Sequence, residues 1–385
     1  MPKNYRSQLG FWLSVPKVSG LALGAVVLML ASCGGGGEAG PTPDPQQPSA
    51  ATGVLSLTGV PRSVPTPVGD AAISATFTEA DNLAFSLGAR GKQTNYSWGA
   101  LEPSGAGLDV NRMRELRSAI EHGRTRGLVH FLGIQVINTQ YRDGPSDLAA
   151  LPFDDPGVLA RMRRLLDNTI GANRGAIRYL SLGNEVDVYL GQRPGEVAAY
   201  AAFLRDAAQY ARTLDPAIQV GVTLTAAGAM GAQQALLRTL NDGITDVVVM
   251  TYYPLDLQAN GRFVVRNPST VGPDVTRMLA LAGAKPLVLQ EAGYPSAPGV
   301  GASQALQTEF MRNLAASWRA ADRRMPYVNV FAMHDFSPTL CDTLVAFYQL
   351  GNNASFRDYL CSLGLRAADG TPKAAWQALT DEMRR

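Results

Sequence analysis

The feature that most constrains the fold is a repeated alternation of short apolar runs with longer amphipathic stretches along most of the chain. Several of the apolar runs are rich in Val, Ile and Leu at consecutive positions. This composition is typical of parallel strands that are covered on both faces. The strand candidates are residues 91–98, 128–138, 177–185, 218–225, 246–254, 286–295 and 327–336.

Helical patterns fill the intervals between these runs. Residues 156–170, 195–216 and 303–324 repeat apolar positions at the spacing of one helix face. An eighth, less distinct strand is expected within residues 53–77. Eight strands that alternate with helices predict an α/β chain folded as a single (β/α)8 TIM barrel. A doubly wound open sheet is the alternative, but the Gly-rich phosphate loop that usually follows its first strand is not found in this sequence.

The N-terminal region has the pattern of an export signal. Lys3, Arg6 and Lys17 precede an apolar run at 18–31, which is too short and one-sided to indicate a membrane span. The run ends in Leu-Ala-Ser-Cys, which resembles a bacterial lipobox, with Cys33 as the lipidated residue. An ordinary secretory signal with a chance Cys is the alternative. We therefore expect a signal peptide at 1–32, a flexible Gly- and Pro-rich tether at 33–53 and a barrel at 54–385.

Charge and cysteine content agree with an exported protein. Residues 1–32 hold three of the 34 basic residues and none of the 32 acidic ones, so the remaining chain has a net charge of −1. There is no basic field for nucleic acid. With Cys33 lipidated, Cys341 and Cys361 remain as a pair that an oxidising compartment permits to form a disulfide. Two unrelated buried thiols are the alternative.

Polar and aromatic residues gather at the ends of the predicted strands. In a (β/α)8 barrel the active site lies at the C-terminal ends of the strands, so these residues are the candidates for chemistry. Simple solvation of strand ends explains one or two of them, but it explains poorly a carboxylate at the end of both the fourth and the seventh strand. The candidates are Trp98, Asn138, Asn184, Glu185, Tyr252, Tyr253, Gln290, Glu291, His334 and Asp335.

Glu185 and Glu291 lie 106 residues apart. At about 35 residues per strand–helix unit, this spacing leads from the fourth strand to the seventh, almost opposite across a small barrel. Two facing carboxylates are what glycoside hydrolysis requires, one to protonate the leaving oxygen and one to attack the anomeric carbon. The three His residues of the chain show no zinc-like spacing, and no G-x-S-x-G nucleophile motif occurs. We therefore expect no metal and no cofactor.

The two Glu motifs also carry a family resemblance. The sequences LSLGNEV, at the end of the fourth strand, and LVLQEAGYPS, at the end of the seventh, resemble clan A glycoside hydrolases, and in particular endo-β-1,3-glucanases and endo-β-1,4-galactanases. The resemblance implies that Glu185 is the acid/base and Glu291 the nucleophile. It also implies that Asn184 binds the sugar 2-hydroxyl and that Tyr253, rather than Tyr252, donates a hydrogen bond to the nucleophile.

Other positions depart from the clan pattern or leave alternatives open. His334 or Phe336 stands where many members carry a Trp beneath the reacting sugar. The second strand offers Lys92, Gln93 and Asn95 in place of a frequent Arg, and Gln290 replaces a small residue. Trp98 and Asn138 either line sugar subsites or pack in the core. Asp187 is expected to be structural.

These observations predict an exported, lipid-anchored envelope protein that cleaves a β-linked glucan or galactan with retention of configuration. We expect it to be a monomer whose partners are a polysaccharide or oligosaccharide and, through Cys33, a membrane on its periplasmic or cell-surface face. The alternatives are an envelope lipoprotein that binds glycan without cleaving it, and a transglycosylase that uses the same two Glu residues. The adjacent Asn184 and Glu185 also require a bend or bulge, because neighbouring side chains point apart on a regular strand.

Overall fold

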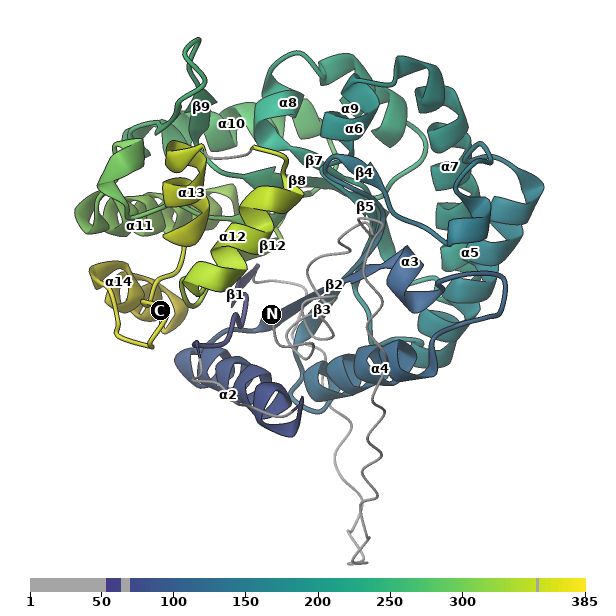
Figure 1. The fold of residues 1–385 in the computed structure, drawn as a ribbon, viewed down its shortest axis with the longest axis horizontal. Coiled ribbons are helices and arrows are strands. Elements are labelled where there is room, and N and C mark those ends of the chain that lie inside the picture. The colour runs from purple at the N-terminus through teal and green to yellow at the C-terminus, as the bar shows by residue number, and fades with distance from the viewer. Residues whose placement is uncertain (1–52, 64–69, 351–352) are drawn as a thin grey trace, which may run out of the picture.

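The computed structural model describes residues 53–63, 70–350 and 353–385 of the chain. Parallel strands form a central barrel, and helices surround it as an outer ring (Figure 1). The predicted α/β (β/α)8 fold is confirmed. The barrel strands are β1 (Val54–Leu57), β2 (Gly91–Ser97), β3 (Val129–Asn138), β5 (Tyr179–Asn184), β6 (Gln219–Gly221), β7 (Thr223–Thr225), β8 (Val248–Tyr252), β11 (Leu287–Ala292) and β12 (Tyr327–Val330).

The barrel consists of two sheets. One has the strand order β2-β3-β5-β6, with the short β4 (Tyr141–Arg142) paired to β3, and the other has the order β1-β12-β11-β8-β7. The predicted strand at 218–225 is split because β6 pairs with β5 while β7 pairs with β8. The sheets join through Val222 on one side. On the other, Ser56 Oγ donates to the Gly91 carbonyl (2.7 Å) and Arg90 N donates to the Leu55 carbonyl (3.4 Å).

Helices follow the strands around the outside of the barrel, and a hairpin of β9 (Leu255–Leu257) and β10 (Phe263–Val265) extends beyond it. Side-chain caps start several helices, such as Asp109 before α4 and Asp155, followed by Pro156, before α5. None of the helices in the described ranges is long and apolar enough to cross a membrane. The helices are α2 (Asp70–Leu87), α3 (Trp98–Leu101), α4 (Val110–Arg124), α5 (Pro156–Thr169), α6 (Val186–Gly191), α7 (Val197–Leu214), α8 (Ala226–Met230), α9 (Gln234–Asn241), α10 (Val271–Ala282), α11 (Gln304–Ala321), α12 (Pro338–Phe347), α13 (Ala354–Cys361) and α14 (Ala374–Met383).

The interior of the barrel changes from apolar to polar along the strands. Near the strand starts, Phe131 lies 5.9 Å from the Tyr327 ring, which lies 5.6 Å from the Tyr179 ring. Two residues further along β12 and β11, Asn329 and Gln290 are fully buried. Because alternate residues of a strand face the same side, each barrel layer lies two residues beyond the one before. The polar layer therefore places hydrogen-bonding groups directly beneath the strand ends.

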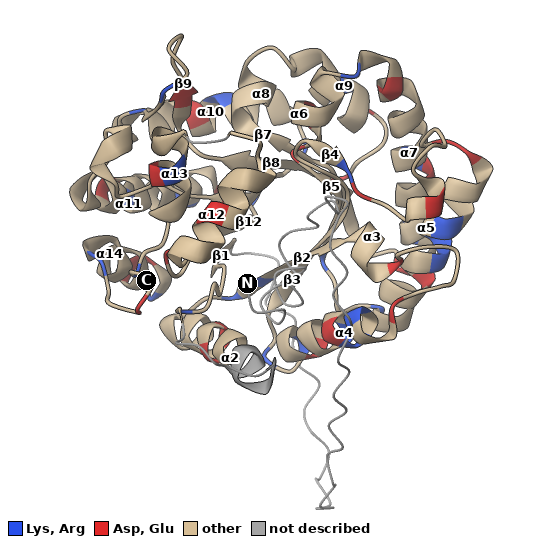
Figure 2. Ribbon diagram, viewed as in Figure 1, with Lys and Arg blue, Asp and Glu red and all other residues tan. Residues whose placement is uncertain are grey.

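The predicted eighth strand at 327–336 ends early, at Val330. The Phe331–Ala332 peptide bond is cis, and the chain then continues into α12 and α13. A disulfide joins Cys341 in α12 to Cys361 at the end of α13, with 5.7 Å between their Cα atoms. The predicted pairing of these two cysteines is confirmed. Charged residues of both signs are spread over the outer helices (Figure 2).

Candidate active site

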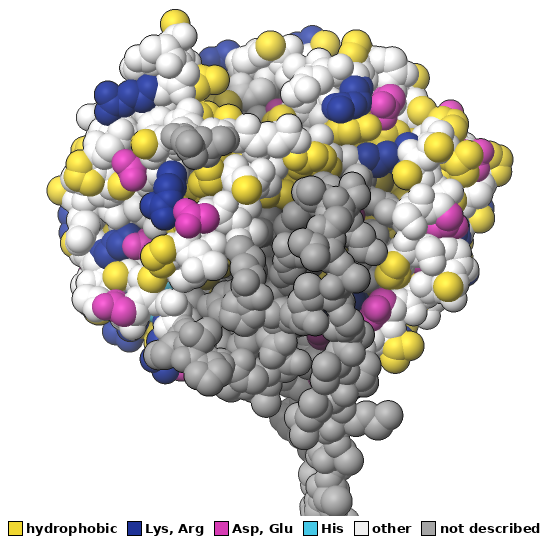
Figure 3. Space-filling view, in the orientation of Figure 1, with side chains coloured by type: hydrophobic (Ala, Val, Ile, Leu, Met, Phe, Trp, Pro, Cys, Tyr) yellow, Lys and Arg dark blue, Asp and Glu magenta, His cyan; other side chains and the backbone are white. Residues whose placement is uncertain are grey.

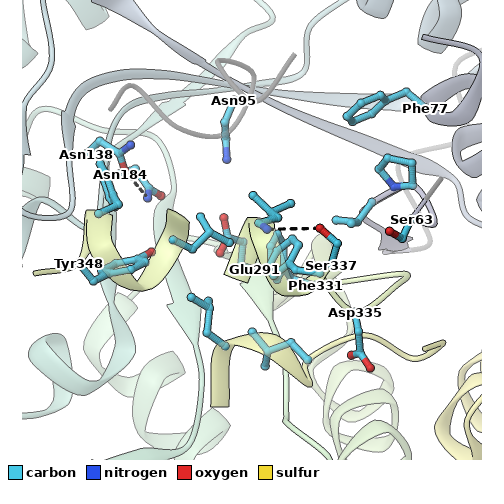
Figure 4. A pocket seen from close by; sticks show the side chains of 18 of the residues that line it. Ser63, Phe77, Asn95, Asn138, Asn184, Glu291, Phe331, Asp335, Ser337 and Tyr348 are labelled. Atoms are coloured by element: carbon cyan, nitrogen blue, oxygen red, sulfur yellow. Dashed lines mark hydrogen bonds between the residues drawn. The ribbon is translucent and has the colours of Figure 1, made fainter. Parts of the chain in front are cut away.

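A pocket lies at the C-terminal ends of the barrel strands, and both predicted catalytic carboxylates line it (Figure 4). Its polar lining comes mainly from the ends of the strands, while its other walls come from the segment after β1 and from α12 and α13. The polar residues on the strand side are Asn95, Gln135, Asn138, Asn184, Glu185, Tyr253 and Glu291.

Glu185 stands on a strained turn between β5 and α6. Its φ of +49° is unusual for a residue other than Gly, and such strain persists where the surrounding structure enforces it. The Thr251 hydroxyl donates to Glu185 Oε1 (2.7 Å), and the Thr139 hydroxyl donates to Oε2 (3.0 Å). Burial raises the pKa of Glu185, while these two hydrogen bonds favour its ionised form.

Glu291 lies on β11 in the opposite sheet. The Tyr253 hydroxyl donates to Glu291 Oε2 (2.8 Å), and the Gln290 amide nitrogen lies 3.4 Å from Oε1. Burial, together with the nearby charge of Glu185, raises the pKa of Glu291 to about 7. The Tyr252 hydroxyl instead bonds Asp274 (2.8 Å) on the outer side of the barrel, so Tyr253 is the tyrosine that faces the carboxylates.

Burial raises the pKa of both carboxyl groups, and hydrogen-bond donors favour the ionised form of each. Glu291 additionally faces the charge of Glu185, which raises its pKa further. Two coupled carboxylates titrate as a pair and not as separate groups. The pair therefore retains a proton to higher pH than two separate, exposed Glu residues would.

Both carboxylates lie at strand irregularities. The pairing of β5 with β3 shifts its register before Asn184, and the pairing of β11 with β8 shifts between Leu289 and Glu291. A bulge lets two successive side chains reach the same side of a sheet. The bend that the sequence predicted at Asn184–Glu185 is confirmed, and a second one lies at Gln290–Glu291.

Gln290 links the two halves of the site, a contact that the sequence analysis missed. Its amide nitrogen donates to Asn184 Oδ1 (2.8 Å) and reaches Glu291, while its amide oxygen accepts from the Thr223 hydroxyl. Asn184 Nδ2 in turn lies 3.4 Å from Asn138 Oδ1. Asn184 and Asn138 thus belong to the pocket, with Gln290 beneath them. The sequence did offer one signal for Gln290: it lies two residues after Val288, and alternate residues of a strand face the same side.

Gln93 is a second residue that sequence reasoning left without a role. Asn329 Nδ2 donates to the Gln290 backbone carbonyl (3.0 Å), which can only accept, so this nitrogen is fixed. It also donates to Gln93 Oε1 (2.6 Å), which accepts from the Thr58 hydroxyl as well (2.9 Å). The Gln93 nitrogen must therefore point away from Asn329. It makes no hydrogen bond within 3.5 Å in the described structure, yet it lies close enough to Glu291 to lower the pKa of that carboxyl.

Trp98 and His334 do not line this pocket. Trp98 begins α3, and its buried indole donates to Glu102 Oε2 (2.9 Å), so packing is its role in this structure. His334 is buried with Nδ1 2.8 Å from the Val60 carbonyl oxygen, whereas Phe336 lines the pocket. The early end of β12 is the reason, because the chain no longer follows strand geometry at His334. Asp187 is buried and accepts from Thr225 N (2.8 Å), which makes it structural.

The remaining predictions concern metals and the lipid anchor. No group of three or more His, Cys, Asp or Glu side chains in the described ranges could hold a metal ion. Cys33, the signal peptide and all but the last residue of the tether lie outside the described residues.

Comparisons with known proteins were made by sequence and by structure. No protein-family model matches the chain, and no curated protein matches its sequence. Solved structures do match. The GH5_18 protein of Bifidobacterium longum subsp. longum superposes with a TM-score of 0.64 at 17% identity, over 86% of this chain and 78% of that one. A variant of it is solved in complex with Manβ1-4GlcNAc.

Two further neighbours have the same architecture. The GH5_18 protein of Streptomyces cattleya, in complex with GlcNAc, gives a TM-score of 0.64 at 16% identity, over 88% of this chain and 81% of that one. An exo-β-1,4-mannosidase from Opitutaceae bacterium strain TAV5 gives 0.62 at 17% identity, over 86% of this chain and 59% of that one. The chain is therefore similar in fold to the TIM barrels of clan A glycoside hydrolases.

Proposed function

We propose that this protein is a retaining glycoside hydrolase that acts on a β-linked saccharide. The observation that carries the proposal is the convergence of Glu185 and Glu291, from opposite sheets, on one pocket in which each is hydrogen-bonded and has a raised pKa. Perturbed carboxylates paired in a cleft are characteristic of catalytic sites. The fold neighbours include proteins that act on or bind β-linked sugars, which agrees with this reaction class.

The reaction takes place in two displacements. Glu291 forms a bond to the anomeric carbon while the glycosidic C–O bond breaks, and Glu185 transfers its proton to the leaving oxygen. Water then attacks the glycosyl–enzyme ester, loses a proton to Glu185 and releases Glu291. In the reactive complex Glu185 must therefore be protonated while Glu291 is ionised. Asn184, fixed by Gln290 and Asn138, is placed to bind a sugar hydroxyl.

The substrate class we propose is a β-glucan or β-galactan, from the sequence motifs, with β-mannosides as the second candidate from the named neighbours. Purified protein should be tested against all three classes of β-glycoside, and NMR should record the anomer that forms first. Glu291→Gly should lose turnover, and azide should restore it on an activated substrate with inverted configuration. Glu185→Ala should slow the cleavage of substrates with poor leaving groups far more than the cleavage of activated substrates.

Three outcomes would contradict the proposal or redirect it. Near-native turnover of Glu291→Gln would exclude Glu291 as the nucleophile. Binding without turnover of any substrate would favour a glycan-binding protein. Products longer than the substrate, formed in the presence of an added acceptor sugar, would favour transglycosylation by the same residues.

We also propose that the protein is exported and lipid-anchored through Cys33, on the basis of its N-terminal sequence.

A further inference from the structure

The pocket has two chemically different sides. The side formed by the barrel strands carries amides and carboxylates, whereas the side formed by α12 and α13 carries leucine and phenylalanine side chains (Figure 4). The segments after β1 and β12 add the polar residues Arg62, Ser63, Asp335 and Ser337 to this second side. Hydrophobic side chains also gather near the middle of the face that Figure 3 shows. The apolar wall, as we call the apolar part of this second side, consists of Leu340, Leu344, Phe347, Leu360, Leu363 and Phe336.

The apolar wall is fixed in place. The disulfide between Cys341 and Cys361 joins its two helices. At the end of α12, the Tyr141 hydroxyl donates to the Phe347 carbonyl (3.1 Å) and the Gln140 amide donates to the Tyr348 carbonyl (2.8 Å). These bonds connect the helix to the loop after β3 across the pocket. The wall is therefore a built surface of the site.

Two of the polar groups beside the apolar wall are already engaged. Asp335 forms an ion pair with Lys373 (2.7 Å), and the Ser337 hydroxyl caps α12 by accepting from Leu340 N (3.3 Å). A sugar ring placed against Leu340 and Leu344 would lose hydrogen bonds from its hydroxyls to water and gain none, which is unfavourable. Hydrocarbon placed there would be stabilised by leaving water.

The apolar wall is also close to the reacting groups. Tyr348, the residue after α12, lines the same pocket as both carboxylates. Burial and the charges of Glu185 and Glu291 raise the pKa of Tyr348. The amide-lined side can satisfy the hydroxyls of one sugar, which leaves the apolar wall for the group that departs. Four of the six residues of this wall are leucines, which gives it a largely aliphatic surface beside Phe336 and Phe347.

We propose that the substrate is an amphiphilic β-glycoside, in which one sugar binds among the strand ends and an apolar aglycone, such as an alkyl chain, binds against the apolar wall. This proposal rests on the proposed function and narrows its substrate class.

A chain-length series tests the proposal. Methyl, butyl and octyl β-glycosides of glucose, galactose and mannose carry alcohols of similar leaving ability, so differences between them report contact with the chain. For the sugar that is cleaved, kcat/KM should rise with each methylene until the wall is covered. The rise should be at most about fourfold per methylene, which corresponds to about 0.8 kcal/mol of burial. Hydrolysis that is independent of chain length would overturn the proposal and leave the proposed function intact.

A matched pair of variants locates the effect. Leu340 lines the pocket and is only half-buried, so Leu340→Gln should fold and should lower the octyl-to-methyl ratio of kcat/KM towards one. Leu257→Gln, at a site on β9 that is 63% exposed, should leave this ratio unchanged. Circular dichroism should verify folding. An unchanged octyl-to-methyl ratio in Leu340→Gln would contradict the proposal.

Binding separates this inference from the proposed function. Calorimetry with octyl and methyl β-glucoside, galactoside and mannoside, each below its micelle concentration, should show tighter binding of the octyl member to Glu291→Gln. If no glycoside is hydrolysed but octyl binding depends on Leu340, the apolar site stands and the enzymatic function fails. Equal affinity for octyl and methyl members of every pair would exclude the apolar site.

Discussion

Glu291 carries a pKa of about 7 because it is buried beside Glu185, and this makes it a destabilising residue at neutral and alkaline pH. Between the usual pKa of a Glu and 7, the folded protein binds more protons than the unfolded chain, so stability falls as pH rises through this window. The loss should reach up to about 3 kcal/mol above pH 7. Catalytic carboxylates commonly carry such a cost.

Glu291→Gln should therefore raise the free energy of unfolding at pH 8 and change it little at pH 4. Urea unfolding at both pH values would measure the difference. Glu309→Gln, at an exposed position of α11, serves as the control and should keep the pH dependence of stability that the wild type shows. A Glu291→Gln protein with the same pH dependence as the wild type would contradict the assigned shift.

Gln93 should influence the nucleophile without contacting substrate. Gln93→Leu removes an amide that favours ionised Glu291, so the pKa of Glu291 should rise and the acidic limb of kcat/KM should move to higher pH. Thr58→Val, which loosens Gln93 from the other side, should shift the limb in the same direction by less. A lower kcat with an unmoved acidic limb would show that Gln93 matters only for packing.

At this scale the sequence predicted the two carboxylates and the Tyr253 contact to Glu291, but not their other partners. Glu185 and Tyr253 directly follow strands, and Glu291 is the last but one residue of β11, so all three lie where strand ends can be located. Gln93 and Gln290 lie inside strands and act through layers that form only when distant strands meet across the barrel. The spacing from Val288 shows that Gln290 faces inward, but no sequence pattern shows which distant residues it contacts.

At the scale of elements, α12 and α13 depend on their cross-link. The disulfide closes a loop with a sequence separation of 20, which in the chain-entropy model contributes up to ~3 kcal/mol. Cys341→Ser together with Cys361→Ser should lower the unfolding free energy by an amount of this order, measured in urea without reductant. Wild type unfolded with reductant should match the double variant. Equal stability of the oxidised wild type and the double variant would show that the bridge contributes nothing.

The elements also show where strand prediction was exact and where it failed. The predicted strands at 91–98, 128–138 and 177–185 match β2, β3 and β5 nearly to the residue. The run at 327–336 was overestimated, because its last residues leave the regular strand after Val330. Their backbone bonds instead reach the segments after β1 and after α13, as from Met333 N to the Thr58 carbonyl (3.0 Å) and from Arg366 N to the Met333 carbonyl (2.9 Å). Burial alone makes a segment apolar, so His334 was assigned to a strand end that lies elsewhere.

At the scale of the whole molecule, the barrel was predictable because its alternation of strands and helices is repeated along the chain. Trp98 shows the limit of this reasoning. The end of β2 was located correctly, yet the chain turns at once into α3 and directs the indole towards Glu102. Such a turn depends on a local cap at Ser97, whose geometry apolar periodicity does not encode.

The proposed anchor is also a property of the whole chain. Cys33→Ala should move the protein from the membrane fraction to the soluble fraction of the exporting cell, because the proposed lipid is attached to Cys33 alone. Fractionation followed by immunoblotting would measure this, with Cys341→Ser as a control that keeps its lipid. A Cys33→Ala protein that stays in the membrane fraction would rule out this anchor.

The division of the barrel into two sheets has a consequence for the chemistry. Glu185 belongs to the sheet of β2, β3, β5 and β6, and Glu291 to the sheet of β1, β12, β11, β8 and β7. The gap between the two carboxylates is therefore a distance between two bodies, joined by Val222 on one side and by Ser56 and Arg90 on the other. In a glycosidase this gap decides whether a carboxylate or a water molecule attacks the sugar, and so whether configuration is retained or inverted. The packing at these two joints therefore contributes to the distance on which that outcome depends.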